Sequence, residues 1–174
     1  QNPSYTLVQA TSGNNHAFNV TKNSSTIKGF TVRNSNYGIN LNSGVLYTTI
    51  SNINLSNNTR GIYSSNSKNN TISNVTVTAT ANSAYGIYLD SSSNFNSLSN
   101  ASITLSGSGS SAIAFTSSSN NTVNGNNATL YNSNSYGVYI YASSSDNIVN
   151  NSVIKTNGSS AHGIYMYNGN SRNL

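Results

Sequence analysis

A short motif returns along almost the whole chain: a small residue, usually glycine, then an apolar residue, a tyrosine and often a second apolar residue. Successive copies begin 21, 23, 25, 26, 25 and 26 residues apart. A period in the low to middle twenties is typical of a solenoid, because each turn can bury its apolar face only against its neighbours. The copies are 38–39, 61–63, 86–89, 137–140 and 163–166, with degenerate versions at 17–20 and 112–115.

The composition favours strands and turns over helices. Asparagine and serine together make up about two-fifths of the residues, and only 5% of the residues are charged. Asparagine and serine side chains compete for backbone hydrogen bonds, which disfavours helix interiors and favours turns. A chain this polar could be a disordered tract. The isoleucine, valine and leucine residues stay in register over six turns, however, so we expect an ordered all-β solenoid.

Each turn is predicted to contain three short strands. In the first, the alternation of side chains points Ile87 and Leu89 inward and Tyr88 outward. The second strand opens on an apolar residue, and the third opens five residues later. The residues that open the second strand are Ile27, Ile50, Ile72, Leu98, Val123, Val149 and Leu174.

An asparagine recurs two positions after the apolar residue that opens the second strand. We predict that these amides stack from turn to turn and form a structural ladder along the axis, since an amide can both donate and accept hydrogen bonds. Simple surface polarity is the alternative. Gly29 and Gly125 stand at the same corner, which fits a positive φ. The predicted ladder residues are Asn52, Asn74, Asn100 and Asn151.

The repeat resembles the right-handed parallel β-helix family, and in particular the NosD-like and pectate-lyase-like repeats that also occur in archaeal surface proteins. Residues 62–77 and 113–128 carry the resemblance best. It implies an all-β, right-handed, single-stranded parallel β-helix of six to seven turns of 21–26 residues. We expect one domain over 1–174, with a partial turn at 1–15, repeats at 16–174 and an uncapped C-terminal end. The fold implies no single function, since it carries lyases, hydrolases, adhesins and scaffolds.

Catalysis and metal binding are disfavoured by the few side chains that could perform them. Enzymes of this fold use clustered acids, whereas the only acids here are Asp90 and Asp146, which we place at least about 10 Å apart along the axis. His16 and His162 lie six turns apart, about 29 Å, and cannot share a metal. We therefore predict no enzyme activity, no catalytic or metal-binding residue and no cofactor.

The charge and hydropathy pattern also disfavours nucleic acids and membranes as partners. The net charge is +5, but it arises from seven dispersed basic residues against two acids. Nucleic-acid surfaces usually cluster their bases. No apolar run approaches the roughly 18 residues needed to span a bilayer. We predict neither nucleic-acid binding nor membrane insertion.

The tyrosines of the motif form the strongest candidate surface. Tyr63, Tyr88, Tyr139 and Tyr165 should project outward in one column, interrupted by Ala114. They could bind sugars or a protein, because tyrosine combines a flat apolar ring with a polar tip. They could equally cover the sheet by cross-strand packing.

Asn-x-Ser/Thr sequons are numerous, but their number is what this composition gives by chance. They make glycans possible without indicating them. The sequon asparagines that we take as candidate glycan sites are Asn23, Asn57, Asn69, Asn120 and Asn157.

The two ends of the predicted solenoid suggest a role in assembly. The chain stops at Leu174, one strand into a turn, and uncapped solenoids expose apolar cross-sections and unpaired strand edges. We expect head-to-tail self-association into an extracellular or cell-surface filament, sheath or stalk. A carbohydrate-binding or adhesive module using the tyrosine column is the alternative, and a lyase or hydrolase remnant is less favoured. The candidate end-to-end contacts are Tyr5, Leu7, Ile164, Met166 and Leu174.

Overall fold

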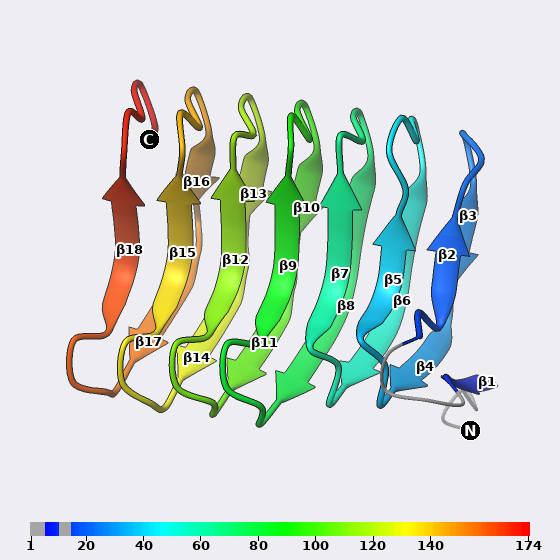
Figure 1. The fold of residues 1–174 in the computed structure, drawn as a ribbon, viewed down its shortest axis with the longest axis horizontal. Coiled ribbons are helices and arrows are strands. Elements are labelled where there is room, and N and C mark those ends of the chain that lie inside the picture. The colour runs from blue at the N-terminus through cyan, green and yellow to red at the C-terminus, as the bar shows by residue number, and fades with distance from the viewer. Residues whose placement is uncertain (1–5, 11–14) are drawn as a thin grey trace.

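The computed structural model describes residues 6–10 and 15–174, and within them the chain forms a solenoid of parallel strands. One sheet takes the first strand of every turn. Its seven strands lie side by side along the long axis of the molecule, with the strands of the other sheet behind them (Figure 1). These strands are β2 (Phe18–Val20), β5 (Tyr37–Leu41), β7 (Arg60–Ser65), β9 (Tyr85–Asp90), β12 (Ser111–Thr116), β15 (Tyr136–Tyr141) and β18 (His162–Tyr167).

The second sheet has eleven strands and takes the rest of each turn. In two turns the second and third segments run together as the long strands β6 and β8; elsewhere they are separate. The strands are β1 (Thr6–Gln9), β3 (Thr26–Lys28), β4 (Phe30–Arg33), β6 (Thr49–Ser56), β8 (Thr71–Ala79), β10 (Ser97–Ser99), β11 (Ser102–Leu105), β13 (Thr122–Asn124), β14 (Asn127–Leu130), β16 (Ile148–Asn150) and β17 (Val153–Thr156).

The strand register repeats the period of the sequence. Ile62 pairs with Ile87, Ile87 with Ile113, and Ile113 with Val138, always in parallel. Each motif therefore lies directly on the motif of the next turn, about 4.8 Å away along the axis. The predicted all-β solenoid is confirmed.

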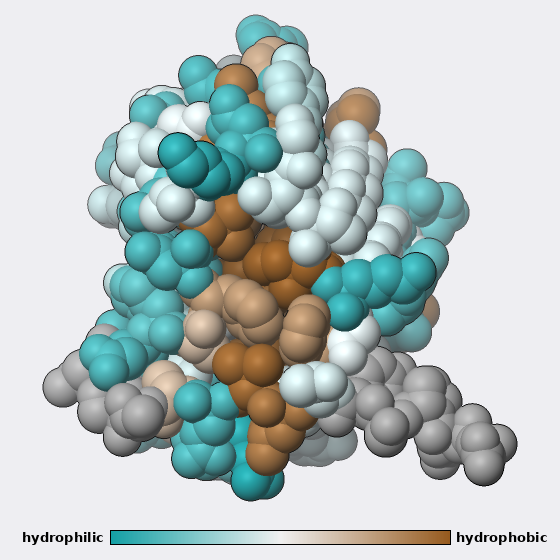
Figure 2. All heavy atoms as spheres, turned by 90° about the vertical axis from the view of Figure 1, so that its right-hand side faces the viewer, coloured by the Kyte–Doolittle hydropathy of each residue, from teal (hydrophilic) through white to brown (hydrophobic). Residues whose placement is uncertain are grey.

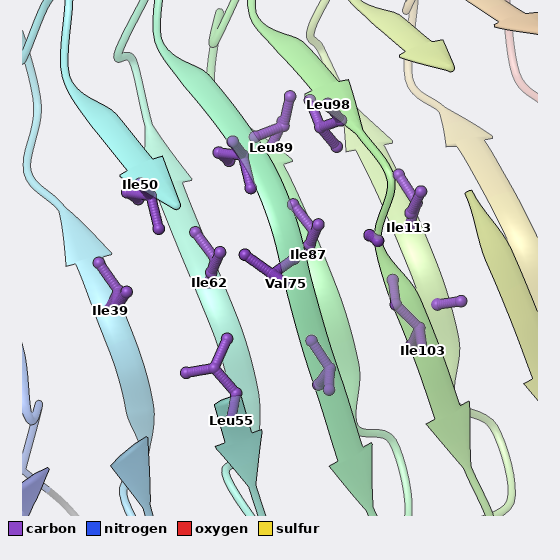
Figure 3. Close-up of a cluster of buried hydrophobic side chains, with 14 of the residues drawn as sticks. Ile39, Ile50, Leu55, Ile62, Val75, Ile87, Leu89, Leu98, Ile103 and Ile113 are labelled. Carbon is purple, nitrogen blue, oxygen red and sulfur yellow. The ribbon is translucent and has the colours of Figure 1, made fainter. Parts of the chain in front are cut away.

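The core is a set of apolar columns between the two sheets. Ile62, Ile87 and Leu89 from the seven-stranded sheet are buried against Val75 and Ile103 from the other sheet (Figure 3). Each such side chain stabilises the fold by about 1.5–3 kcal/mol. At the N-terminal end, hydrophobic residues gather in the middle of the molecule, with hydrophilic ones around them (Figure 2).

The alternation of side chains breaks at the motif glycine, or at Ala112 in its place, and the residue pairing skips this position on both strands of each pair from β5 to β18. Tyr85 pairs with Ser111 and Ile87 pairs with Ile113, while Gly86 between them is buried beside Ile87. A Cβ atom at Gly86 would lie 2.5 Å from the carbonyl oxygen of Ala112 and 2.8 Å from Ile103 Cγ2. Glycine thus permits close approach of the next turn. The extra inward residue also leaves Tyr85 and Tyr88 on the same outer face.

An asparagine ladder does run through the solenoid, at a different corner from the one predicted. The backbone N–H and side-chain Nδ2 of Asn70 both donate to Asn96 Oδ1, at 2.9 and 3.1 Å. The N–H and Nδ2 of Asn96 make the same pair of bonds to Asn121 Oδ1. The buried ladder consists of Asn70, Asn96, Asn121 and Asn147, and ends on the half-buried Asn173.

A second ladder of hydroxyls runs beside the asparagines. The backbone N–H of Ser67 donates to Ser93 Oγ, that of Ser93 to Ser118 Oγ, and that of Ser118 to Ser144 Oγ. All four serines are buried. Buried backbone N–H groups need hydrogen-bond acceptors. In the polar turn after the first strand, the serine hydroxyls of the next turn provide them.

The asparagines predicted to form the ladder occupy a surface corner instead. Their φ angles of 47–53° lie in the left-handed region, which asparagine and glycine tolerate best. Gly29 and Gly125 occupy the same corner with φ of 77° and 66°. The assignment of the ladder to these residues was therefore wrong: they turn the backbone, and Asn151 Nδ2 donates not to Asn126 or Asn100 but to Asn124 Oδ1 of the preceding turn, outside the corner position. The corner residues are Asn52, Asn74, Asn100 and Asn151.

Leu174 also differs from its predicted alignment. Its N–H donates to the carbonyl oxygen of Asn147, and its own carbonyl accepts from the N–H of Val149. It therefore lies level with Ile148, one residue before the apolar column, and its side chain is 83% exposed. It does not open the second strand of the last turn.

Candidate functional site: an aromatic face

The outer face of the seven-stranded sheet carries two adjacent columns of mostly aromatic side chains. The tyrosines of the motif form one column: Tyr63 pairs with Tyr88, and Tyr139 with Tyr165, while Ala114 lies between Tyr88 and Tyr139. The residue before the motif glycine forms the other, because the break in the alternation turns it outward. Its members are Tyr37, Arg60, Tyr85, Ser111, Tyr136 and His162.

The N-terminal half of this face is a cluster of four tyrosines around an arginine, which we call the Arg60 cluster. The guanidinium carbon of Arg60 lies 4.9 Å from the ring centre of Tyr37 and 5.4–5.6 Å from those of Tyr63, Tyr85 and Tyr88. The rings of Tyr85 and Tyr88 stack at 4.7 Å. Each cation–π contact stabilises the arrangement by about 0.5–2 kcal/mol, depending on how dry it is.

Arg60 lacks a carboxylate partner within the described residues. Among the residues that the structure describes, the ion pair is between Arg172 and Asp146, with nitrogen–oxygen distances of 2.6 and 2.7 Å. Asp90, the other acid, lies five residues beyond the strand position level with Arg60, about 15 Å along the strands. The Nε atom of Arg60 is buried and has no hydrogen-bond partner among those residues.

Asp90 lies at the C-terminal end of β9, at the edge of the Arg60 cluster opposite Arg60. The Tyr63 hydroxyl donates to Asp90 Oδ2 at 3.0 Å. Burial, and then the Asp90 carboxylate, raise the pKa of Tyr63 to about 12. Burial also raises the pKa values of Tyr88 and Tyr139 above the usual value for tyrosine. These three phenols therefore stay neutral to a higher pH than an ordinary tyrosine.

These pKa values predict a loss of stability in alkali. In the unfolded chain Tyr63 loses its proton near pH 10, whereas in the folded chain it keeps the proton until about pH 12. The folded state thus binds more protons between pH 10 and 12, and the free energy of unfolding falls across that window. Ultraviolet absorbance of tyrosinate should show a late-titrating tyrosine, and Asp90→Asn should shift its titration toward pH 10. An unchanged titration would contradict the assigned role of Asp90.

The C-terminal half of the face is a second aromatic cluster, which we call the Tyr139 cluster. The rings of Tyr136 and Tyr139 stack at 5.0 Å, and those of Tyr136 and Tyr165 at 4.9 Å. Tyr141 and Tyr167 extend it, with rings nearly parallel at 5.9 Å. His162 stacks on Tyr165 at 5.1 Å.

Small side chains from β12 separate the two clusters. Ser111, Ala114 and Thr116 take the outward positions of that strand, paired with tyrosines of β15 on one side and with β9 on the other. The flanking strands β9 and β15 lie two turns apart, about 9.6 Å. Ser111 and Ala114 are only 1% and 0% exposed, so neighbouring side chains cover them and this strip is not an open gap in the face.

The residues considered for chemistry lie apart. Asp146 forms a two-pronged pair with Arg172, which holds the pKa of that carboxyl below its usual value. His16 stacks on Tyr37 at the first turn, and His162 lies in the Tyr139 cluster. Within residues 6–10 and 15–174, no three His, Asp, Glu or Cys side chains come together as a metal site.

The candidate glycan sites are all exposed, and their modification stays a prediction. Three of them, Asn57, Asn69 and Asn120, adopt left-handed φ angles of 51–59° at corners. Asn23 Oδ1 accepts from the N–H of Leu46. The exposed set is Asn23, Asn57, Asn69, Asn120 and Asn157.

The candidate end-to-end residues lie at both extremes of the described solenoid. Leu7 is in β1, which pairs with β4, and is 48% exposed. Ile164 and Met166 continue the inward columns of β15 but are 48% and 55% exposed in β18. Tyr5 lies outside the described residues.

Comparison with known proteins places the chain in a family defined by its fold. Residues 41–174 match the family model described as right handed beta helix region, and since this is most of the chain, the protein belongs to that family. Neither the curated proteins nor the solved structures gave a significant match. In the described part of the chain there is no helix long and apolar enough to cross a membrane.

Proposed function

We propose that the protein is a carbohydrate-binding β-helix module that holds a glycan chain on its aromatic face. The observation that carries this proposal is the row of tyrosine rings along the outer face of one parallel sheet, in two clusters on either side of β12. The alternative, that the tyrosines only cover the sheet, accounts for ring stacking within each cluster.

The spacing of the rings supports a polymeric ligand. One strand position recurs about every 4.8 Å along the axis, a length comparable to one pyranose residue in an extended glycan. Tyrosine offers sugar rings a flat apolar surface and a hydroxyl at its edge. A glycan lying along the axis would therefore meet ring after ring. Such polymers belong to cell surfaces and matrices, so the proposal places the module outside the cell.

The proposal is of binding without catalysis. Both acids of the chain are already engaged, Asp90 by the Tyr63 hydroxyl and Asp146 by Arg172. They also belong to different parts of the turn, since Asp90 ends β9 whereas Asp146 lies in the loop between β15 and β16. A glycosidase needs two carboxylates facing one bond, about 5–10 Å apart.

A glycan-binding measurement with ring-deleted variants tests the proposal. Tyr139→Ala should weaken binding of an extended oligosaccharide by about five- to tenfold, because one aromatic contact contributes about 1 kcal/mol. Tyr139→Phe should bind nearly as well as the unchanged protein. Tyr131→Ala is the matched control, since Tyr131 is 53% exposed and lies in the connection between β14 and β15, outside the strands of the face. Equal losses for the two alanine variants, or no binding across a broad glycan array, would overturn the proposal.

An end-to-end structural role is the second candidate, favoured by the exposed apolar positions of β18. Any further turn, from this chain or from another copy, would cover Ile164 and Met166 in the register of the solenoid. Edge strands with such residues readily pair with a further strand. Sedimentation velocity over a range of concentrations tests this: we expect growth of assemblies, abolished by Met166→Lys. A concentration-independent monomer would exclude self-assembly of this chain.

A further inference from the structure

We infer that the glycan held on the aromatic face is acidic, and that a carboxylate or sulfate group on it pairs with Arg60. This inference rests on the proposed function and specifies the ligand of the same site. It follows from the surroundings of Arg60, from the other residues in its column, and from the position of Asp90.

The first observation is the unmatched charge of Arg60. Its guanidinium lies among four tyrosine rings at 4.9–5.6 Å, and its Nε is buried without a hydrogen bond to any residue that the structure describes. Partial burial of a cation costs free energy unless an anion or several acceptors compensate it. Aromatic faces compensate only in part. An anionic group on a ligand would compensate this charge at the two terminal Nη nitrogens, which are suited to binding two oxygens.

The second observation is that the fold does not require arginine at this position. In neighbouring turns the same outward position holds Tyr37, Tyr85 and Ser111, with the same strand pairing. The repeat therefore accepts a neutral aromatic or a small hydroxyl there. The charge is an addition to the face, and Arg60 is the one residue with a permanent positive charge in that column.

The third observation gives the ligand a direction. Asp90 lies at the end of β9, about 15 Å from Arg60 along the strands, and its carboxylate is held by Tyr63. An acidic group is attracted at the Arg60 edge of the cluster and repelled at the Asp90 edge. The Tyr139 cluster carries no such charge, so we assign the neutral parts of the glycan to it.

The test compares glycans that differ only in charge. The probes are a polyuronate oligomer, the same oligomer with its carboxyl groups methyl-esterified, and a sulfated neutral oligomer of equal length. For the unchanged protein at low salt we expect the charged forms to bind at least tenfold more tightly than the ester, with the advantage shrinking as salt is added. The two charged probes distinguish carboxylate from sulfate recognition.

Three variants locate the effect. Arg60→Gln should remove the preference for acidic probes, so that the acid and its ester bind with equal affinity. Arg60→Tyr, which copies the adjacent turns, should do the same and guards against misfolding of the first variant. Arg33→Gln is the matched charge control, because Arg33 lies on the other sheet, where its Nε donates to Gln9 Oε1. It should keep the preference.

The outcomes separate this inference from the proposed function. Equal binding of ester and acid by the unchanged protein overturns the inference and leaves glycan binding intact. Loss of the preference in Arg33→Gln as large as in Arg60→Gln also overturns it, since net charge alone would then explain the effect. No binding of any probe would count against the proposed function itself.

Discussion

Gly86→Ala is expected to lower the free energy of unfolding by about 3 kcal/mol, the upper end of the usual cost of overpacking. The added methyl group would lie 2.5 Å from the backbone carbonyl oxygen of Ala112 and 2.8 Å from Ile103 Cγ2. A side chain can move aside, but the carbonyl belongs to the adjacent strand of the sheet. Relief of the clash would therefore separate β9 from β12. Urea unfolding followed by circular dichroism measures the loss.

The chain contains a natural comparison at the next turn. Ala112 takes the place of the motif glycine, and the facing residue of β14 is Ala128, whereas Gly86 faces Ile103 and Gly137 faces Ile154. A small partner thus makes room for the extra methyl group. We expect Ala112→Gly to cost less than 1 kcal/mol, and Ile103→Ala to recover part of the loss in Gly86→Ala. A cost below about 0.5 kcal/mol for Gly86→Ala would contradict the packing argument.

The fold was readable from the sequence because its information is periodic. Columns such as Ile62, Ile87 and Ile113 recur at the spacing of the motif, and the structure pairs these same residues. Because each turn stacks on equivalent residues of the next turn, the period determines most of the strand register. The family match over residues 41–174 agrees with it.

Period alone did not say which asparagines point inward. Asparagine recurs at the positions of both Asn74 and Asn96 in successive turns, so the period fits a ladder at either position equally well. The difference is local. Ser73 and Asn74 form a corner between the inward residues Ile72 and Val75, and the φ of 51° at Asn74 turns its side chain outward. Asn96 lies two residues before the inward Leu98, which places it on the same side as the core.

The candidate site was half predictable for a similar reason. The outward direction of Tyr88 follows from simple alternation. By the same alternation Tyr85 and Arg60 should point inward, but two consecutive residues, the motif glycine and the next, are buried, which reverses this. Two consecutive inward residues, one of them glycine, are the signal that could have shown the second column. The Arg60 cluster therefore emerged only from the structure.

Asn96→Ala is expected to lower the free energy of unfolding by about 4 kcal/mol, because it removes the hydrogen bonds of the buried ladder to both neighbouring turns. Asn96 Oδ1 accepts from the N–H and Nδ2 of Asn70, and Asn96 Nδ2 donates to Ser67 O and Asn121 Oδ1, all within 3.1 Å. Removing the amide leaves several buried polar groups unpaired, at about 1–3 kcal/mol each. Asn96 is 2% exposed, which leaves water little access to replace it. Chemical denaturation measures the loss.

The surface corner provides the matched control for the ladder. Asn74→Ala should cost about 1 kcal/mol or less, since it removes no ladder bond and only places alanine at a left-handed φ of 51°. Asn74→Gly should be close to neutral, because Gly29 and Gly125 already occupy that corner in other turns. If Asn74→Ala cost as much as Asn96→Ala, the corner asparagines would share in holding the stack together. A cost concentrated at Asn96 means that the solenoid depends on amides aligned inside its wall, and that the surface asparagines are free to vary.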